Sequence, residues 1–182
     1  KKAMALGDNG QFKEALEEME NALAENPDDL KIKWDLLHKT GLALQKFGQV
    51  DRAIEYWKQA IELDPKVSSE PYFLIALNAA NMKKYNEANE YFLKTIELAP
   101  KHHKALYYLA ILKLEEEAKD VYNPAKAVEY AERVNEMTAS REPIMLELLG
   151  WAYAANGNFK SAVSSMEKAL EYAKPRNIPE LT

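Results

Sequence analysis

Apolar residues recur at intervals of three and four along most of the chain, and short stretches rich in Gly, Asn or Pro interrupt them. This spacing is typical of amphipathic α-helices separated by turns. The pattern predicts an all-α fold. The predicted helices span residues 1–8, 11–25, 29–46, 50–63, 69–82, 85–98, 102–119, 124–137, 142–155 and 159–173.

The predicted helices form a repeat. The segment AIEYWKQAIELDP at 53–65 and the segment ANEYFLKTIELAP at 88–100 share alanines, aromatic residues, an Ile-Glu-Leu triplet and a final proline. The same frame recurs around Ala15, Ala127 and Ala162. A repeat of this length that contains two helices indicates an array in which each helix pair packs against the next.

Small and large residues alternate along the repeat as this packing requires. Gly10, Gly48 and Gly157 end one helix of a pair, because glycine adopts a left-handed backbone at little cost. The prolines at 65 and 100 end the other helix. Small residues such as Gly41 allow close approach of two helices. Large residues are expected to fill the space between helices: Trp57, Tyr72, Tyr85, Phe92, Tyr153 and Phe159.

Charge and composition exclude several classes of function. The net charge is -5, and no stripe of basic residues is visible, so we expect no nucleic acid among the partners. Without cysteines there is no disulfide or thiolate metal site, and the compartment, cytoplasmic or periplasmic, stays open. No apolar run reaches the roughly 20 residues of a membrane helix, so this segment is not expected to insert directly into a membrane. Because the chain opens with Lys1 in a helical pattern, we expect it to be a piece of a longer protein.

No group of residues has the spacing of a catalytic, cofactor or metal site. The adjacent His102 and His103 lie at a helix start and have no acidic residue at ligand spacing. His38 stands alone on a helix, and the acidic run at 115–117 is typical of a solvated helix end. We therefore predict a protein without enzymatic activity, cofactor or bound metal.

The repeat resembles the tetratricopeptide repeat (TPR) family. The fifth copy, LELLGWAYAANGNFKSAVSSMEKAL, is similar to the family pattern nearly throughout, and the second matches through Gly41, Gly48, Ala53, Trp57, Ala60 and Pro65. The fourth copy departs most, with Pro124 in place of an aromatic residue and about five extra residues in LEEEAKDVYNP.

The resemblance implies a right-handed α-solenoid of about five helix-turn-helix repeats within residues 1–176. The expected repeats are about 1–28, 29–66, 67–101, 102–140 and 141–174, and residues 177–182 are expected to begin a truncated capping helix or a linker.

One stripe of the first helix in each repeat is a candidate binding surface. The resemblance implies that this stripe lines the concave face of the solenoid, where tyrosine and tryptophan concentrate binding energy. The alternative is that these residues only widen the core between repeats. The candidate residues for binding a protein or peptide are His38, Leu42, Lys46, Phe73, Leu77, Asn81, Lys104, Tyr107, Tyr108, Ile111, Glu147 and Trp151.

Three functions follow from this pattern. The first is a non-catalytic scaffold that binds a peptide or helix of a partner protein in an aromatic-rich groove. The second is the C-terminal tail of a larger, membrane-bound enzyme, because the ending resembles the last repeats of large bacterial membrane proteins that include glycosyltransferases. The third is self-association, with homodimers forming through the exposed ends of the array.

Overall fold

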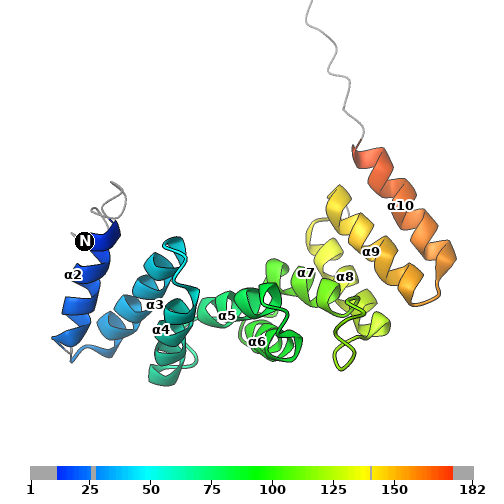
Figure 1. Ribbon diagram of the computed structural model, residues 1–182. Coiled ribbons are helices and arrows are strands. Elements are labelled where there is room, and N and C mark those ends of the chain that lie inside the picture. Colours follow the sequence, from blue (N-terminus) through cyan, green and yellow to red (C-terminus); the bar gives the residue numbers. More distant parts are fainter. Residues whose placement is uncertain (1–11, 26–27, 140, 174–182) are drawn as a thin grey trace, which may run out of the picture. The chain divides into compact units, whose positions relative to one another are not determined.

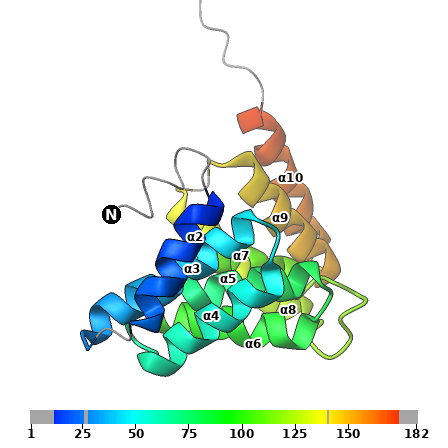
Figure 2. The same ribbon diagram turned by 60° about the vertical axis from the view of Figure 1, so that its left-hand side comes forward.

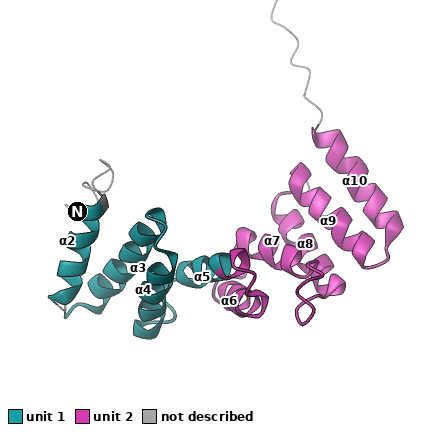
Figure 3. Ribbon diagram, in the orientation of Figure 1, with its two compact units in different colours: residues 1–78 teal, residues 79–182 magenta. Residues whose placement is uncertain are grey.

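The computed structural model describes residues 12–25, 28–139 and 141–173, and every regular element in these ranges is an α-helix (Figure 1). This confirms the all-α fold class. The chain divides into two compact units, residues 1–78 and residues 79–182 (Figure 3). The helix predicted at 1–8, Gly10 and the segment 177–182 lie outside the described residues.

Unit 1 contains helices predicted to within one residue at each end. Helix α3 packs against both α2 and α4. The side chain of Asp29 caps α3, accepting hydrogen bonds from the backbone N–H groups of Lys31 (2.8 Å) and Ile32 (3.2 Å). The helices are α2 (Phe12–Ala24), α3 (Leu30–Lys46), α4 (Val50–Leu63) and α5 (Glu70–Asn81), of which α5 runs past the boundary at residue 78.

Unit 2 repeats the same arrangement. Helix α7 contacts α6 and α8, α8 contacts α9, and α9 packs along α10. Figures 1 and 2 show α9 and α10 side by side from two directions. The helices are α6 (Tyr85–Leu98), α7 (His103–Leu112), α8 (Pro124–Met137), α9 (Pro143–Ala155) and α10 (Phe159–Ala173).

Left-handed residues join the two helices of a pair. Gly48 has φ 73° and Gly157 has φ 79°, which confirms that these glycines end helices α3 and α9. At the equivalent turn before α6, Lys83 adopts φ 57° although it has a side chain. A non-glycine residue pays about 1–2 kcal/mol for this conformation, so the turn geometry is kept even where the sequence does not favour it.

The predicted helix at 102–119 is wrong beyond residue 112. Helix α7 ends at Leu112, and the extra residues form a loop that the backbone N–H of Asn123 closes by donating to the carbonyl oxygen of Lys113 (2.9 Å). The loop buries Ala118 and Val121, and the side chain of Asn123 then caps α8. The buried side chains of Ala118 and Val121 stabilise the loop in place of further helix, and α7 and α8 pack against each other.

Large side chains from the second helices fill the space beside small residues of the first helices. Trp57 and Phe92 are fully buried, as predicted. Gly41 is needed at its position, because a Cβ atom there would lie 2.4 Å from Nε1 of Trp57. The prediction that Phe159 fills the same kind of space is wrong: its side chain is 68% exposed. No helix follows α10 in the described part of the chain, so nothing there covers this residue.

Candidate functional site

Five of the candidate residues belong to unit 1, and they differ widely in exposure. On α3, His38 and Leu42 are half-buried and Lys46 is exposed. On α5, Leu77 is half-buried, whereas Phe73 is only 5% exposed and offers almost no surface to a partner.

The imidazole of His38 lies in an apolar setting. Its ring stacks on the ring of Trp34 with centroids 5.2 Å apart, and its Nδ1 atom is buried without a hydrogen-bond partner among the described residues. Burial lowers the pKa of His38 below its ordinary value of 6.5, although the charges of Glu70 and Asp35 act in the opposite direction. Burial and stacking on Trp34 therefore make the His38 ring part of the packing of α3.

The other seven candidates belong to unit 2, beginning with Asn81, which is exposed at the end of α5. Helix α7 carries two adjacent tyrosines with different roles. Tyr108 stacks on the buried Phe92 of α6, with ring centroids 5.8 Å apart and planes 4° apart. Tyr107 meets Tyr108 edge to face at 5.4 Å and is half-buried. Tyr108 thus takes part in the packing between α6 and α7, and both tyrosines are half-buried.

Exposed residues continue along one side of α7 and α9. On α7, Lys104 and Ile111 are exposed, and on α9 Glu147 is exposed and Trp151 is 59% exposed. Sequence reasoning missed Ile144, which is 52% exposed and lies three residues before Glu147 and seven before Trp151. That spacing places it on the same side of the helix, so the register alone could have identified it.

Helices α7 and α9 are neighbours, since they contact each other directly as well as sharing contacts with α8. Tyr153, on a different side of α9, ties this helix to α8 by donating a hydrogen bond to Oε1 of Glu132 (2.6 Å). Burial together with this hydrogen bond raises the pKa of Tyr153 to about 12. The hydroxyl stays protonated at physiological pH, as tyrosine ordinarily does, and its hydrogen bond joins α9 to α8.

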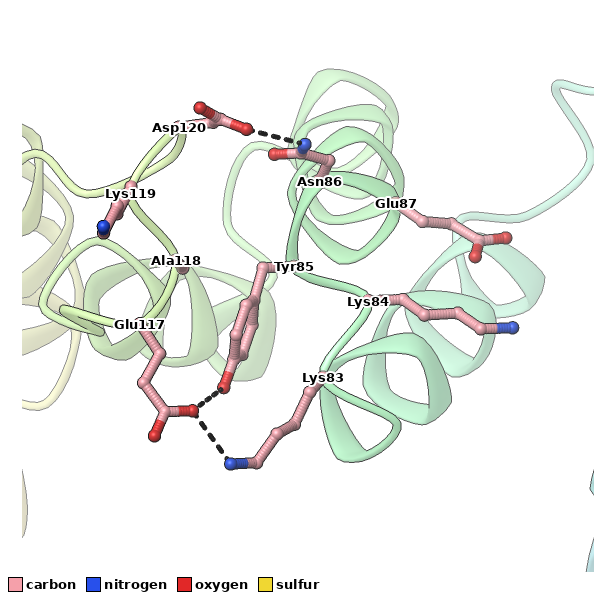
Figure 4. A pocket seen from close by; sticks show the side chains of 9 residues that line it. All are labelled: Lys83, Lys84, Tyr85, Asn86, Glu87, Glu117, Ala118, Lys119 and Asp120. Atoms are coloured by element: carbon pink, nitrogen blue, oxygen red, sulfur yellow. Dashed lines mark hydrogen bonds and ion pairs between the residues drawn. The ribbon is translucent and has the colours of Figure 1, made fainter.

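A polar hollow of about 600 Å³ lies between the turn before α6 and the loop after α7, and the sequence did not predict it (Figure 4). Oε2 of Glu117 accepts hydrogen bonds from Nζ of Lys83 (2.8 Å) and from the hydroxyl of Tyr85 (3.3 Å). On the other side, Nδ2 of Asn86 donates to Oδ2 of Asp120 (3.3 Å). Because these groups pair with one another across the hollow, they anchor the loop to the turn.

Within the described ranges, no group of three or more His, Asp or Glu side chains is placed to hold a metal ion. None of the helices in the same ranges has the length and hydropathy needed to cross a bilayer.

Comparison with known proteins identifies the repeat. The sequence pattern of the tetratricopeptide repeat matches residues 8–70, and a second pattern with the same description matches residues 69–102 and 145–175. Together these ranges cover well over half of the 182 residues. No curated protein matches the chain.

Solved structures share the fold. A crystal structure of MamA protein is 22% identical with a TM-score of 0.80, over 99% of this chain and 92% of that one. Residues 41 to the end of MamA from Desulfovibrio magneticus RS-1 are 19% identical with a TM-score of 0.74, over 96% and 93% of the two chains. At this identity the likeness shows the fold alone, an all-α solenoid. With the repeat pattern matched along most of its length, the chain belongs to the tetratricopeptide repeat family.

Proposed function

We propose that the chain, a protein–protein interaction scaffold by its family, binds a peptide or helix of a partner protein on the exposed side of α7 and α9. One observation carries the proposal: the two helices are neighbours, and both leave large apolar side chains in solvent. Ile111 is 36% exposed, Ile144 52% and Trp151 59%. Exposed large apolar residues that gather on adjacent elements are typical of interaction sites.

The composition of this side suits a protein partner. Tyr107 and Trp151 are aromatic residues of the kind that dominate binding energy, since they bury a large area and lose few rotamers. Lys104 and Glu147 supply opposite charges at the edge, where they favour register and specificity more than affinity. Unit 1 has separate candidates of its own, the half-buried His38, Leu42 and Leu77, whereas the buried Phe73 would only support them.

The tryptophans provide a direct test. Trp34 is 8% exposed and Trp57 is fully buried. The fluorescence typical of a solvent-exposed tryptophan therefore comes from Trp151. Peptides selected from a random phage-displayed library against the wild-type chain would be titrated while this emission is recorded. Covering Trp151 should shift its emission to the blue. We expect Tyr107→Ala to weaken binding by a factor of about 10, which corresponds to roughly 1.4 kcal/mol.

The matched control is Leu93→Ala on α6, because Leu93 is also exposed (38%) but lies outside the proposed surface. It should bind the same peptides with unchanged affinity. Trp151→Ala, followed by calorimetry, should weaken binding like Tyr107→Ala, and thermal unfolding would show that all three variants stay folded. Equal losses in Leu93→Ala and Tyr107→Ala, or an unshifted emission on binding, would refute the assignment.

The alternative, a tail that positions a larger enzyme, uses the same kind of surface. It differs in the protein to which this chain is joined.

A further inference from the structure

Helix α10 leaves a continuous apolar stripe in solvent. Phe159 is 68% exposed, Val163 57% and Leu170 67%, and the half-buried Met166 lies between the last two. Positions 159, 163, 166 and 170 follow one another at spacings of four, three and four, so they lie along one side of the helix. The contact side adjoins the stripe: Ala162, Ser165 and Ala169 are buried where α10 packs along α9, and Met166, at the border, reaches Gly150 of α9.

The repeat shows that this stripe is a contact surface. Val163 corresponds to Ile54, Asn89 and Val128 of helices α4, α6 and α8, and all three are half-buried. The residues equivalent to Phe159 and Leu170 in α4 and α6 are also half-buried. In the array the first helix of the next pair covers these positions, as α7 does for α6 and α9 does for α8. Among the described helices, none covers the stripe of α10 in this way.

Charges beside the stripe favour an antiparallel helix as that neighbour. Helices α2, α4 and α6 carry an acidic residue in the first turn, which suits the positive end of the helix dipole. Helix α10, like α8, has neither an acidic first turn nor a basic last turn. It carries Lys160 in the first turn and Glu171 in the last, and these two residues flank the stripe on the same side, three turns apart.

We propose that a second copy of this chain covers the stripe, with the two α10 helices antiparallel about a two-fold axis. A two-fold axis perpendicular to both helices makes the second helix run in the opposite direction. The same flank of each helix then lies on the same side of the interface. Lys160 of each copy then faces Glu171 of the other, and Phe159 lies beside Leu170 of the other. A parallel pair would not bring these charges together. The stripe is distinct from the proposed partner surface on α7 and α9, so the inference goes beyond the proposed function.

The association should be weak and dependent on concentration. A contact one helix wide is at the small end of specific interfaces. Sedimentation velocity of the 182-residue chain across micromolar to millimolar concentrations, at low salt, should show a monomer–dimer equilibrium. Val163→Glu would place a charge in the middle of the interface between the two α10 helices and should abolish the dimer. Because Val163 is exposed, circular dichroism should show unchanged helix content.

Charge reversal tests the antiparallel geometry itself. Lys160→Glu and Glu171→Lys should each raise the dimer Kd about tenfold, because each creates two like-charge pairs. A 1:1 mixture of the two variants should form a heterodimer close to wild-type strength, since both facing pairs are then opposite in charge. The double variant should recover in the same way. A wild-type chain that stays monomeric throughout the range, or single variants that do not recover on mixing, would overturn the proposal.

Discussion

At the scale of single residues, Gly41 and Gly150 occupy the same position of different repeats but have different neighbours. Comparing them distinguishes the backbone cost of glycine in a helix from the packing around it. Gly41 lies against the buried ring of Trp57, and a Cβ atom there would be 2.4 Å from Nε1. Nε1 also donates a hydrogen bond to the carbonyl oxygen of His38 (3.3 Å), which holds the ring in place. At Gly150 the nearest atom would be the terminal methyl of Met166 at 2.8 Å, which belongs to a flexible side chain.

We therefore expect opposite outcomes for the same substitution. Alanine in a helix is favoured over glycine by about 1 kcal/mol, whereas overpacking a rigid core costs about 1–3 kcal/mol. Gly41→Ala should lower the free energy of unfolding by up to about 2 kcal/mol, and Gly150→Ala should leave it unchanged or raise it. Urea unfolding of both variants beside the wild type would measure this. If Gly150→Ala were destabilised and Gly41→Ala were neutral, the rigidity assigned to Trp57 and the flexibility assigned to Met166 would both be wrong.

His38 makes a second prediction at this scale. Its folded-state pKa is lowered, so between the folded value and the unfolded value of 6.5 the unfolded chain binds more protons at this site. The His38 contribution to stability is therefore fully present above pH 6.5 and is lost as the pH falls through the folded pKa. The charges of Glu70, Asp35 and Lys39 around the ring modify this effect without reversing it.

The measurement is the change in unfolding free energy between pH 8 and pH 5, compared for the wild type and His38→Gln. The wild type should lose more stability over this interval, because the glutamine side chain does not titrate. Equal losses would mean that the imidazole titrates alike in the folded and unfolded chains.

At the scale of elements, the sequence predicts most of what is local and less of what depends on neighbours. Eight of the predicted helices agree with the described helices to within one residue, because helical periodicity, caps and turn residues are written in the nearby sequence. Helix α7 is the exception, since its end depends on the start of α8. The anchoring of the loop by Glu117 was invisible for the same reason, because it pairs with Lys83 and Tyr85 of the preceding repeat.

The same division holds for the candidate surface. The stripe selected from the sequence contains Ile111 and Trp151, which are exposed, but also Phe73, which is buried. Phe159 was expected in the core because equivalent positions carry large residues, and its exposure follows only from the absence of a following helix in the described part. Helix register states which residues share a side, whereas burial depends on which helices come next.

At the scale of the whole molecule, the described structure consists of two compact units, each with its own packed helix pairs. Trp57 fills the interior of the α3–α4 pair in unit 1, and Phe92 with Tyr108 fills the contact of α6 and α7 in unit 2. In repeat arrays, stability is approximately a sum of repeat and nearest-neighbour contributions, so a local defect can open one part without the rest.

Gly41→Ala makes this testable, because the strain it introduces lies between α3 and α4. Native-state hydrogen exchange, read by mass spectrometry, should show faster exchange in α3 and α4 and unchanged exchange in α9 and α10. Gly150→Ala is the matched control, and it should leave exchange in α3 and α4 as in the wild type. A uniform rise across all helices in Gly41→Ala would mean that the chain unfolds as one cooperative body, and the additive account of the array would then be wrong.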